Sequence, residues 1–195
     1  MALSLIYGAS SGALHALTGP DHVLSLGPVA LRHPRESFRI GLYWGVGHAL
    51  GTLLLGLPAL FLSNAFDLAT LAAHGTRLAG LALMLTAALS LHTLSRARSA
   101  ASSVERKSPL FVGLVHGVTG AASLLLVLPM VALGSAAHTL TFLVAFGVGS
   151  ALAMAGLTFA IARLGQRLPA RAVGLAQRGL GAAGFALGAA FFAVG

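Results

Sequence analysis

The chain has 195 residues, of which 57% are hydrophobic and only 8% are charged. A soluble domain carries about 25% charged residues, so this composition cannot cover a globule with polar surface and excludes a water-soluble monomer. The absence of cysteine excludes disulfides, thiolate metal sites and thiol catalysis. The net charge of +8 comes from basic residues that stand in short stretches between apolar runs. This arrangement indicates membrane topology, and we expect no nucleic-acid partner.

Six apolar runs approach or exceed the length of about 20 residues that a helix needs to cross a bilayer. They predict an all-α polytopic membrane protein with six transmembrane helices, over residues 3–31, 40–62, 77–95, 109–134, 139–162 and 178–195. The runs are long and do not alternate apolar with polar residues, which favours helices over a barrel. No basic residue precedes the first apolar stretch, so we expect a retained helix there rather than a signal peptide.

The basic residues predict the orientation of these helices. Eleven of the twelve fall in three connections on one side of the predicted bundle: Arg32, Arg35 and Arg39; Arg96, Arg98, Arg106 and Lys107; and Arg163, Arg167, Arg171 and Arg178. The positive-inside rule places these connections in the cytoplasm, with both termini outside the cell (inner) membrane. Residues 96–108, rich in small and polar side chains, are expected to form a flexible cytoplasmic linker.

The chain also contains an internal repeat. Two pairs of segments align: GALHALTG at 12–19 with GLVHGVTG at 113–120, and GVGHAL at 45–50 with GVGSAL at 147–152. Each copy holds three predicted helices, and an odd number turns the second copy upside down relative to the first. We therefore expect two inverted three-helix repeats, residues 1–95 and 109–195, with a transport site at their interface near the bilayer midplane.

Four polar side chains stand out in the first two predicted helices: His15, Asp21, His22 and His48. A carboxylate at bilayer depth costs roughly 2.5–3.5 kcal/mol on insertion scales, so it persists only with a partner or a function. His15 and His22 are seven residues apart, which places them on one face of a continuous helix. Imidazole and carboxylate donors suit Ni²⁺ or Co²⁺ and do not exclude Zn²⁺. Each histidine taken alone is also typical of a hydrogen-bonded core residue.

A helix break is expected between the first two of these histidines. Pro20 donates no N–H, and its ring clashes with the carbonyl four residues earlier. We expect the helix to stop at Gly19, with Thr18 capping a second half-helix and Asp21 in the first turn of that half-helix. Broken helices at membrane depth are tolerated where they line a cavity or are buried in protein. The free carbonyls would then lie beside the imidazoles and the carboxylate, as ligands for a divalent cation.

The segment HALTGPDH at residues 15–22, followed by a basic connection and GVGH at 45–48, resembles the nickel/cobalt transporter superfamily. Its nearest branch is the six-helix, urease-accessory (UreH-type) membrane proteins. The resemblance implies that His15, Asp21 and His22 select and bind the metal, with His48 contributing from the next helix. The permease signature has four residues between its His and its Asp-His pair, whereas five intervene here. That spacing matches the hydrogenase/urease accessory (HupE/UreJ-type) nickel permeases.

The second repeat lacks most of these donors. Ala122, Ser123 and Ser150 stand at the positions of the acid and of two imidazoles of the first repeat. His116 remains, at the position that matches the first histidine. It is a weaker candidate, either as a fourth ligand or as a step on the ion's path. The alternative is a core histidine bonded to a nearby carbonyl or to Thr119.

We expect a permease for a divalent transition metal, Ni²⁺ or Co²⁺, acting in uptake, with no enzymatic activity and no prosthetic group. Metal efflux is an alternative. An intramembrane metalloprotease would need a Glu in its helix motif, and no Glu lies within a predicted span. A haem-binding electron carrier is a further alternative, because paired histidines on facing helices ligate haem iron, although a neighbouring carboxylate fits haem poorly.

The expected partners follow from this function. They are the metal ion as substrate and the lipid bilayer, and a second copy of the chain and metalloenzyme maturation machinery are candidates. His74 and His138 are expected on the outer side, as weaker candidates for collecting metal, and His33 is expected to be structural.

Overall fold

The structure, a computed structural model, describes residues 1–61, 68–95, 109–119 and 135–194, and these are all-helical apart from short connections. Its helices are α1 (Ala2–Thr18), α2 (Pro20–Arg32), α3 (Ser37–Phe61), α4 (Leu68–Ser95), α6 (Pro109–Thr119), α8 (Ala136–Gly165) and α9 (Ala170–Val194). The all-α prediction is confirmed. The expected linker 96–108 and the positions of Ala122 and Ser123 lie outside the described residues.

Two helices begin well before the apolar runs that predicted them. The run at 77–95 belongs to α4, and the run at 178–195 belongs to α9, which starts directly after Pro169. Arg171 and Arg178, expected in a connection, therefore lie within α9 and are exposed. The physical reason is that Ala, Leu, Gln and Arg are strong helix formers, so the helix continues past the apolar stretch.

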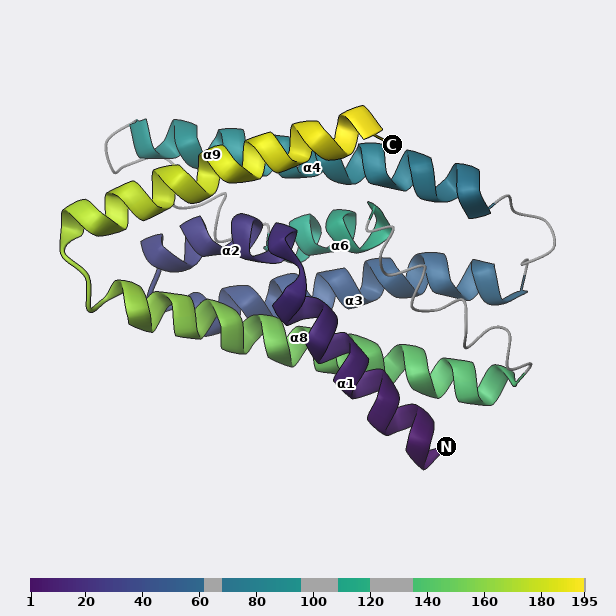
Figure 1. The fold of residues 1–195 in the computed structure, drawn as a ribbon. Coiled ribbons are helices and arrows are strands. Elements are labelled where there is room, and N and C mark those ends of the chain that lie inside the picture. The colour runs from purple at the N-terminus through teal and green to yellow at the C-terminus, as the bar shows by residue number, and fades with distance from the viewer. Residues whose placement is uncertain (62–67, 96–108, 120–134, 195) are drawn as a thin grey trace.

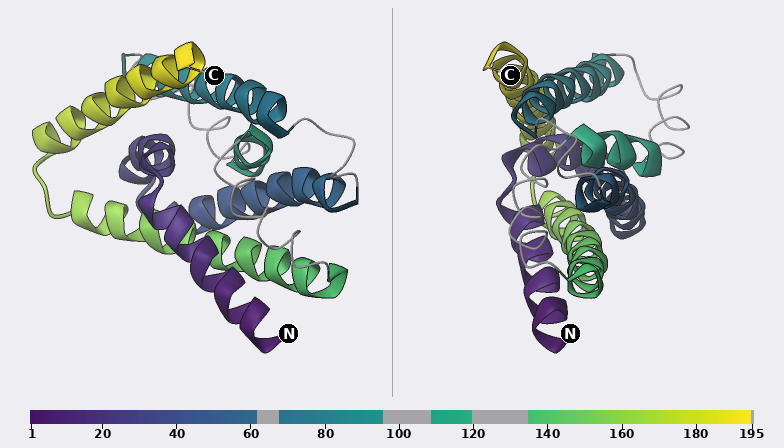
Figure 2. Two further views of the ribbon diagram at one scale, coloured as in Figure 1. Left: turned by 45° about the vertical axis from the view of Figure 1, so that its right-hand side comes forward. Right: turned by 90° about the vertical axis from the view of Figure 1, so that its right-hand side faces the viewer.

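The helices form three layers (Figures 1 and 2). α4 and α9 pack along each other on one side, α3 and α8 pack along each other on the other side, and the short helices α2 and α6 lie between them. α1 packs along α8, and α6 packs along α3. The first helix of each half of the chain thus lies against a helix of the other half.

Aligned glycines make these two contacts alike. A Cβ atom on Gly12 in α1 would overlap the backbone carbonyl of Phe146 in α8, and a Cβ atom on Gly113 in α6 would overlap that of Trp44 in α3. Only glycine permits so close an approach of two helix backbones. The glycines correspond in the repeat alignment, so both halves use the same local device to dock their first helix.

The outer surface of this assembly is apolar. Large hydrophobic side chains on the outside are more than half exposed, among them Leu85, Phe111, Leu152 and Leu175. Within the described residues, one helix, the 30-residue α8, is by itself long and apolar enough to cross a membrane. The six-span arrangement stays a prediction.

Candidate metal site

The break between α1 and α2 is where the sequence predicted it. α1 ends at Thr18, Gly19 is extended with φ −70° and ψ 110°, and Pro20 opens α2. A Cβ atom on Gly19 would lie 2.6 Å from Nδ1 of His22, so glycine leaves room for that ring. The predicted cap is wrong: the Thr18 hydroxyl donates back to the carbonyl of Leu14 at 2.8 Å, and Gly19 occupies the cap position.

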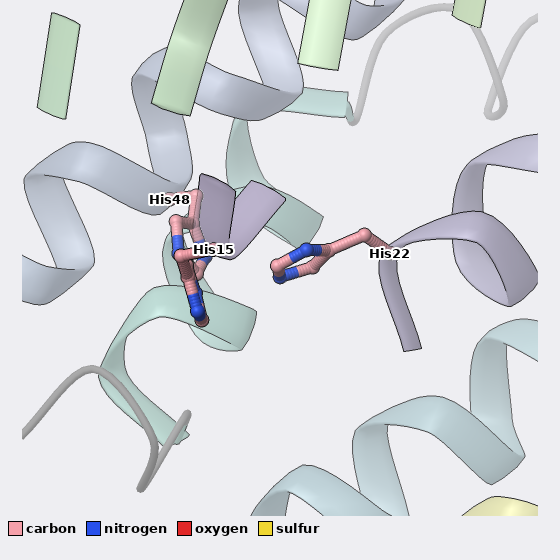
Figure 3. Close-up of side chains that lie close together, drawn as sticks. All are labelled: His15, His22 and His48. Atoms are coloured by element: carbon pink, nitrogen blue, oxygen red, sulfur yellow. The ribbon is translucent and has the colours of Figure 1, made fainter. Parts of the chain in front are cut away.

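Four helices bring the predicted donors together. His15 comes from α1, Asp21 and His22 from α2, His48 from α3 and His116 from α6. One ligand atom from each of His15, His22 and His48 lies within 4.8 Å of the others, and the same holds for Asp21, His22 and His116. Figure 3 shows the His22 ring pointing from α2 toward the rings of His15 and His48. Asp21 and His22 are adjacent in sequence, and further donors reach them from both halves of the chain.

His22 has one ring nitrogen committed and the other free to bind. Its Nδ1 lies 3.1 Å from the carbonyl oxygen of Ala16. A carbonyl only accepts, so Nδ1 carries the hydrogen and Nε2 keeps the lone pair. Nε2 is buried and has no hydrogen-bond partner among the described residues, and the side chain is 0% exposed. A histidine fixed by a carbonyl on one nitrogen, with the other nitrogen bare, is typical of a metal ligand.

His15 and His48 present further buried nitrogens. Neither ring nitrogen of His48, nor Nε2 of His15, has a hydrogen-bond partner within the part of the chain that the structure describes. His48 is 1% exposed. Leaving a buried polar group unsatisfied costs about 1–3 kcal/mol, so several such groups facing one another need a physical explanation. A cation bound among them supplies one.

Asp21 binds His116 directly. Nε2 of His116 donates to Oδ2 of Asp21 at 2.7 Å, and the same oxygen lies 3.9 Å from Nε2 of His22. The side chains of Asp21 and His116 are 21% and 4% exposed. The Thr119 hydroxyl donates to the carbonyls of Val115 and His116, whereas the His116 ring bonds to Asp21. His116 lies in the same cluster as the donors of the first repeat.

Sequence reasoning missed Trp44, the single tryptophan of the chain. Its indole stacks on His48, with ring centroids 5.4 Å apart and planes 7° apart. It also contacts the rings of His22 and His116, at centroid distances of 5.6 and 5.0 Å. The i, i+4 spacing of Trp44 and His48 could have indicated this contact. On another side of the cluster, Phe146 packs against His15 at 5.6 Å.

The donors line a cavity of about 370 Å³, which is completed by Thr76, Ala79 and Phe191 from α4 and α9. This volume accommodates an ion with several of its waters, since one water occupies about 30 Å³ in the liquid. The four imidazole rings are already in contact, with centroids 4.9 to 5.9 Å apart.

The remaining histidines lie outside both ligand groups. His33 caps the end of α2, His74 and His92 lie in α4, and His138 lies in the first turn of α8. Ser150, which matches His48 in the repeat, donates to the carbonyl of Gly12 at 3.0 Å and contributes packing instead of a ligand.

Comparison with known proteins gives three relatives. The chain is 33% identical over 177 residues to Chloroplast protein FOR GROWTH AND FERTILITY 2 of Arabidopsis thaliana, covering 83% of this chain and 47% of the relative. It is 33% identical over 173 residues to Chloroplast protein FOR GROWTH AND FERTILITY 1 of the same plant, covering 77% and 47%. The chain therefore spans about half the length of these two relatives.

The third relative is the Urease accessory protein UreH of Bacillus sp. (strain TB-90). It is 26% identical over 171 residues, which cover 79% of this chain and 74% of UreH. The chain thus has distant, partial homology to a urease accessory protein. No family model and no solved structure matches the chain.

Proposed function

We propose that the protein is a membrane permease for a divalent transition-metal cation, with Ni²⁺ or Co²⁺ as the preferred substrate. The observation that carries this proposal is the set of buried imidazole nitrogens of His15, His22 and His48, which lie within 4.8 Å of one another and lack protein partners among the described residues. Such nitrogens are ligands for late first-row divalent metals. The distant similarity to UreH supports the same assignment.

The proposal places the helices in a bilayer, and the apolar outer surface supports this placement. Soluble monomers rarely expose apolar patches beyond a few hundred Å², whereas here every layer carries exposed Leu and Phe side chains. In this arrangement α1 and α2 together form one broken span, and its break lies where the cavity is. A break of this kind is tolerated at membrane depth because protein surrounds it.

The arginines support one orientation. A Cβ atom on Gly165 would meet the side chain of Leu31, so the C-terminal ends of α2 and α8 lie at the same end of the molecule. Arg32 follows Leu31 directly, and Arg163 and Arg167 flank Gly165. Basic residues from both halves thus gather at one end, which the positive-inside rule assigns to the cytoplasm.

The matching glycine contacts support two inverted repeats. If the halves are related by a two-fold axis in the membrane plane, the first helix of each half meets the other half in the same way. The overlaps at Gly12 and Gly113 have that form. In transporters built in this way the substrate site lies at the repeat interface. Asp21 of the first half and His116 of the second half meet at that place.

Uptake is the proposed direction. A divalent cation gains about 4.6 kcal/mol on moving inward across 100 mV, negative inside, which is twice the value for a single charge. That gain drives accumulation without a coupled ion or an enzymatic step. The proposed location is accordingly the cell membrane.

The test is radioactive nickel uptake into proteoliposomes that contain purified protein, with an imposed negative-inside potential and with cobalt or zinc as competitor. We expect potential-dependent accumulation that cobalt suppresses. His48→Ala should abolish it, whereas His92→Ala, which removes an exposed histidine of α4, should not change it. Equal uptake by His48→Ala and wild type would contradict the assignment of these histidines as the transport site. Absence of uptake by wild type would contradict the permease function itself.

A further inference from the structure

We propose that the ion occupies two alternative positions that share His22. The three-imidazole position consists of His15, His22 and His48, and the carboxylate position consists of Asp21, His22 and His116. This inference rests on the proposed function and describes how the same site passes its ion along.

The geometry separates the donors into these two sets. Within each set the ligand atoms lie within 4.8 Å of one another. Donor atoms bound tetrahedrally to one ion at about 2.1 Å lie about 3.4 Å apart, so the three-imidazole set needs only a small closure to bind. In the carboxylate set the ion takes the place of the hydrogen between Asp21 and His116, whose donor atoms are 2.7 Å apart and move slightly apart to bind it. Of the five donors, only His22 belongs to both sets.

The two positions exclude each other because His22 has a single free lone pair. Its Nδ1–H donates to the carbonyl of Ala16, which leaves Nε2 as the one nitrogen that binds metal. One lone pair binds one ion. A second ion therefore cannot bind while the first is held, and the protein binds one ion per chain.

The positions differ in charge and access. Asp21 gives the carboxylate position a negative charge, and its side chain is 21% exposed. A hydrated cation is drawn to such a charge. The three-imidazole position is neutral and includes His48, which is 1% exposed. Neutral imidazoles favour late transition metals over Mg²⁺ and Ca²⁺. The carboxylate position therefore attracts divalent cations in general, and the three-imidazole position selects the transition metals among them.

Sharing a ligand provides a step between the positions. The ion exchanges Asp21 and His116 for His15 and His48 while it stays bound to His22, so it is never stripped of all protein ligands. Conduction requires binding that is strong enough to admit an ion and distributed enough to release it. Two neighbouring positions with one common ligand meet that requirement.

The test measures nickel binding by calorimetry, and its ligands by X-ray absorption, on purified wild type, His48→Ala and His116→Ala. Binding constants of mutually exclusive positions add, so the variant that keeps the stronger position retains at least about half of the wild-type constant. We expect three imidazole ligands in His116→Ala, and imidazole with carboxylate oxygen in His48→Ala. His22→Ala should bind no nickel, and wild type should bind one ion.

Circular dichroism and gel filtration establish that each variant folds, and His48→Gln and His116→Gln replace any alanine variant that does not. His92→Ala, at an exposed position of α4, is the matched control for removal of an imidazole. Loss of binding in both His48→Ala and His116→Ala would show a single site that uses all of these ligands. That result would overturn the proposal of two positions and leave the proposed permease function unaffected. Two ions per wild-type chain would also overturn them. Absence of nickel binding by wild type would overturn the proposed function itself.

Discussion

Replacing Asp21 with Asn keeps the size of the side chain and removes its charge. In the structure this carboxylate accepts a hydrogen bond from His116 at 2.7 Å. An amide oxygen still accepts that bond, and a neutral side chain costs less to bury than a charged one. We therefore expect Asp21→Asn to fold and insert, with stability within about 1 kcal/mol of wild type. The effect should fall on transport.

The size of the effect on transport follows from the negative charge that the substitution removes from beside the ion. A unit negative charge and a divalent cation about 4 Å apart attract by about 2 kcal/mol in water and by about 8 kcal/mol at an effective dielectric constant of 20. The smaller value alone corresponds to about a 30-fold weaker carboxylate position, since 1.4 kcal/mol is tenfold. Nickel transport at low external concentration should fall by at least that factor.

The assay is the initial rate of nickel uptake at concentrations below saturation, for wild type and Asp21→Asn at matched expression. Glu36→Gln is the matched control, because it makes the same acid-to-amide change in the α2–α3 connection, where Glu36 pairs with Arg39 at 3.1 Å. It should transport at the wild-type rate. A wild-type rate in Asp21→Asn would mean that the carboxylate serves helix packing, and the reasoning from charge would fail.

Three further outcomes are expected. Gly113→Ala should destabilise the protein by about 1–3 kcal/mol in thermal unfolding, because the added Cβ atom would overlap the Trp44 carbonyl. Gly156→Ala is the control: its Cβ atom would meet nothing within 4 Å, so this variant should be more stable than wild type by about 0.5–1 kcal/mol. Trp44→Leu should weaken nickel binding about 10- to 100-fold in calorimetry, as is typical when the groups that orient metal ligands are lost. Nickel affinity should fall on acidification, because only neutral imidazole binds metal and protons compete for the same nitrogen; an affinity that is unchanged down to the pH at which the protein unfolds would exclude histidine ligands.

The parts of the site that the sequence predicts are those set by local chemistry. Pro20 breaks the helix because its own ring removes a donor and clashes with the preceding turn, and the structure has the break at Gly19. The close approach of α1 and α3 to their neighbours likewise depends on local residues, because glycines stand at the points where the helix backbones meet.

The parts that it does not predict depend on tertiary packing. His116 and Asp21 are 95 residues apart, and nothing in the spacing of either residue requires them to meet. Trp44 reaches three imidazoles at once because α2, α3 and α6 converge. The early start of α9 reflects helix propensity in a stretch that apolar periodicity does not mark.

The most direct test of the central claim is a crystal structure of the protein with nickel, with diffraction recorded on both sides of the nickel absorption edge. The account predicts an anomalous peak about 2.1 Å from Nε2 of His22, inside the cavity between α1, α2, α3 and α6. An anomalous peak elsewhere, or none in a preparation that transports nickel, would contradict it.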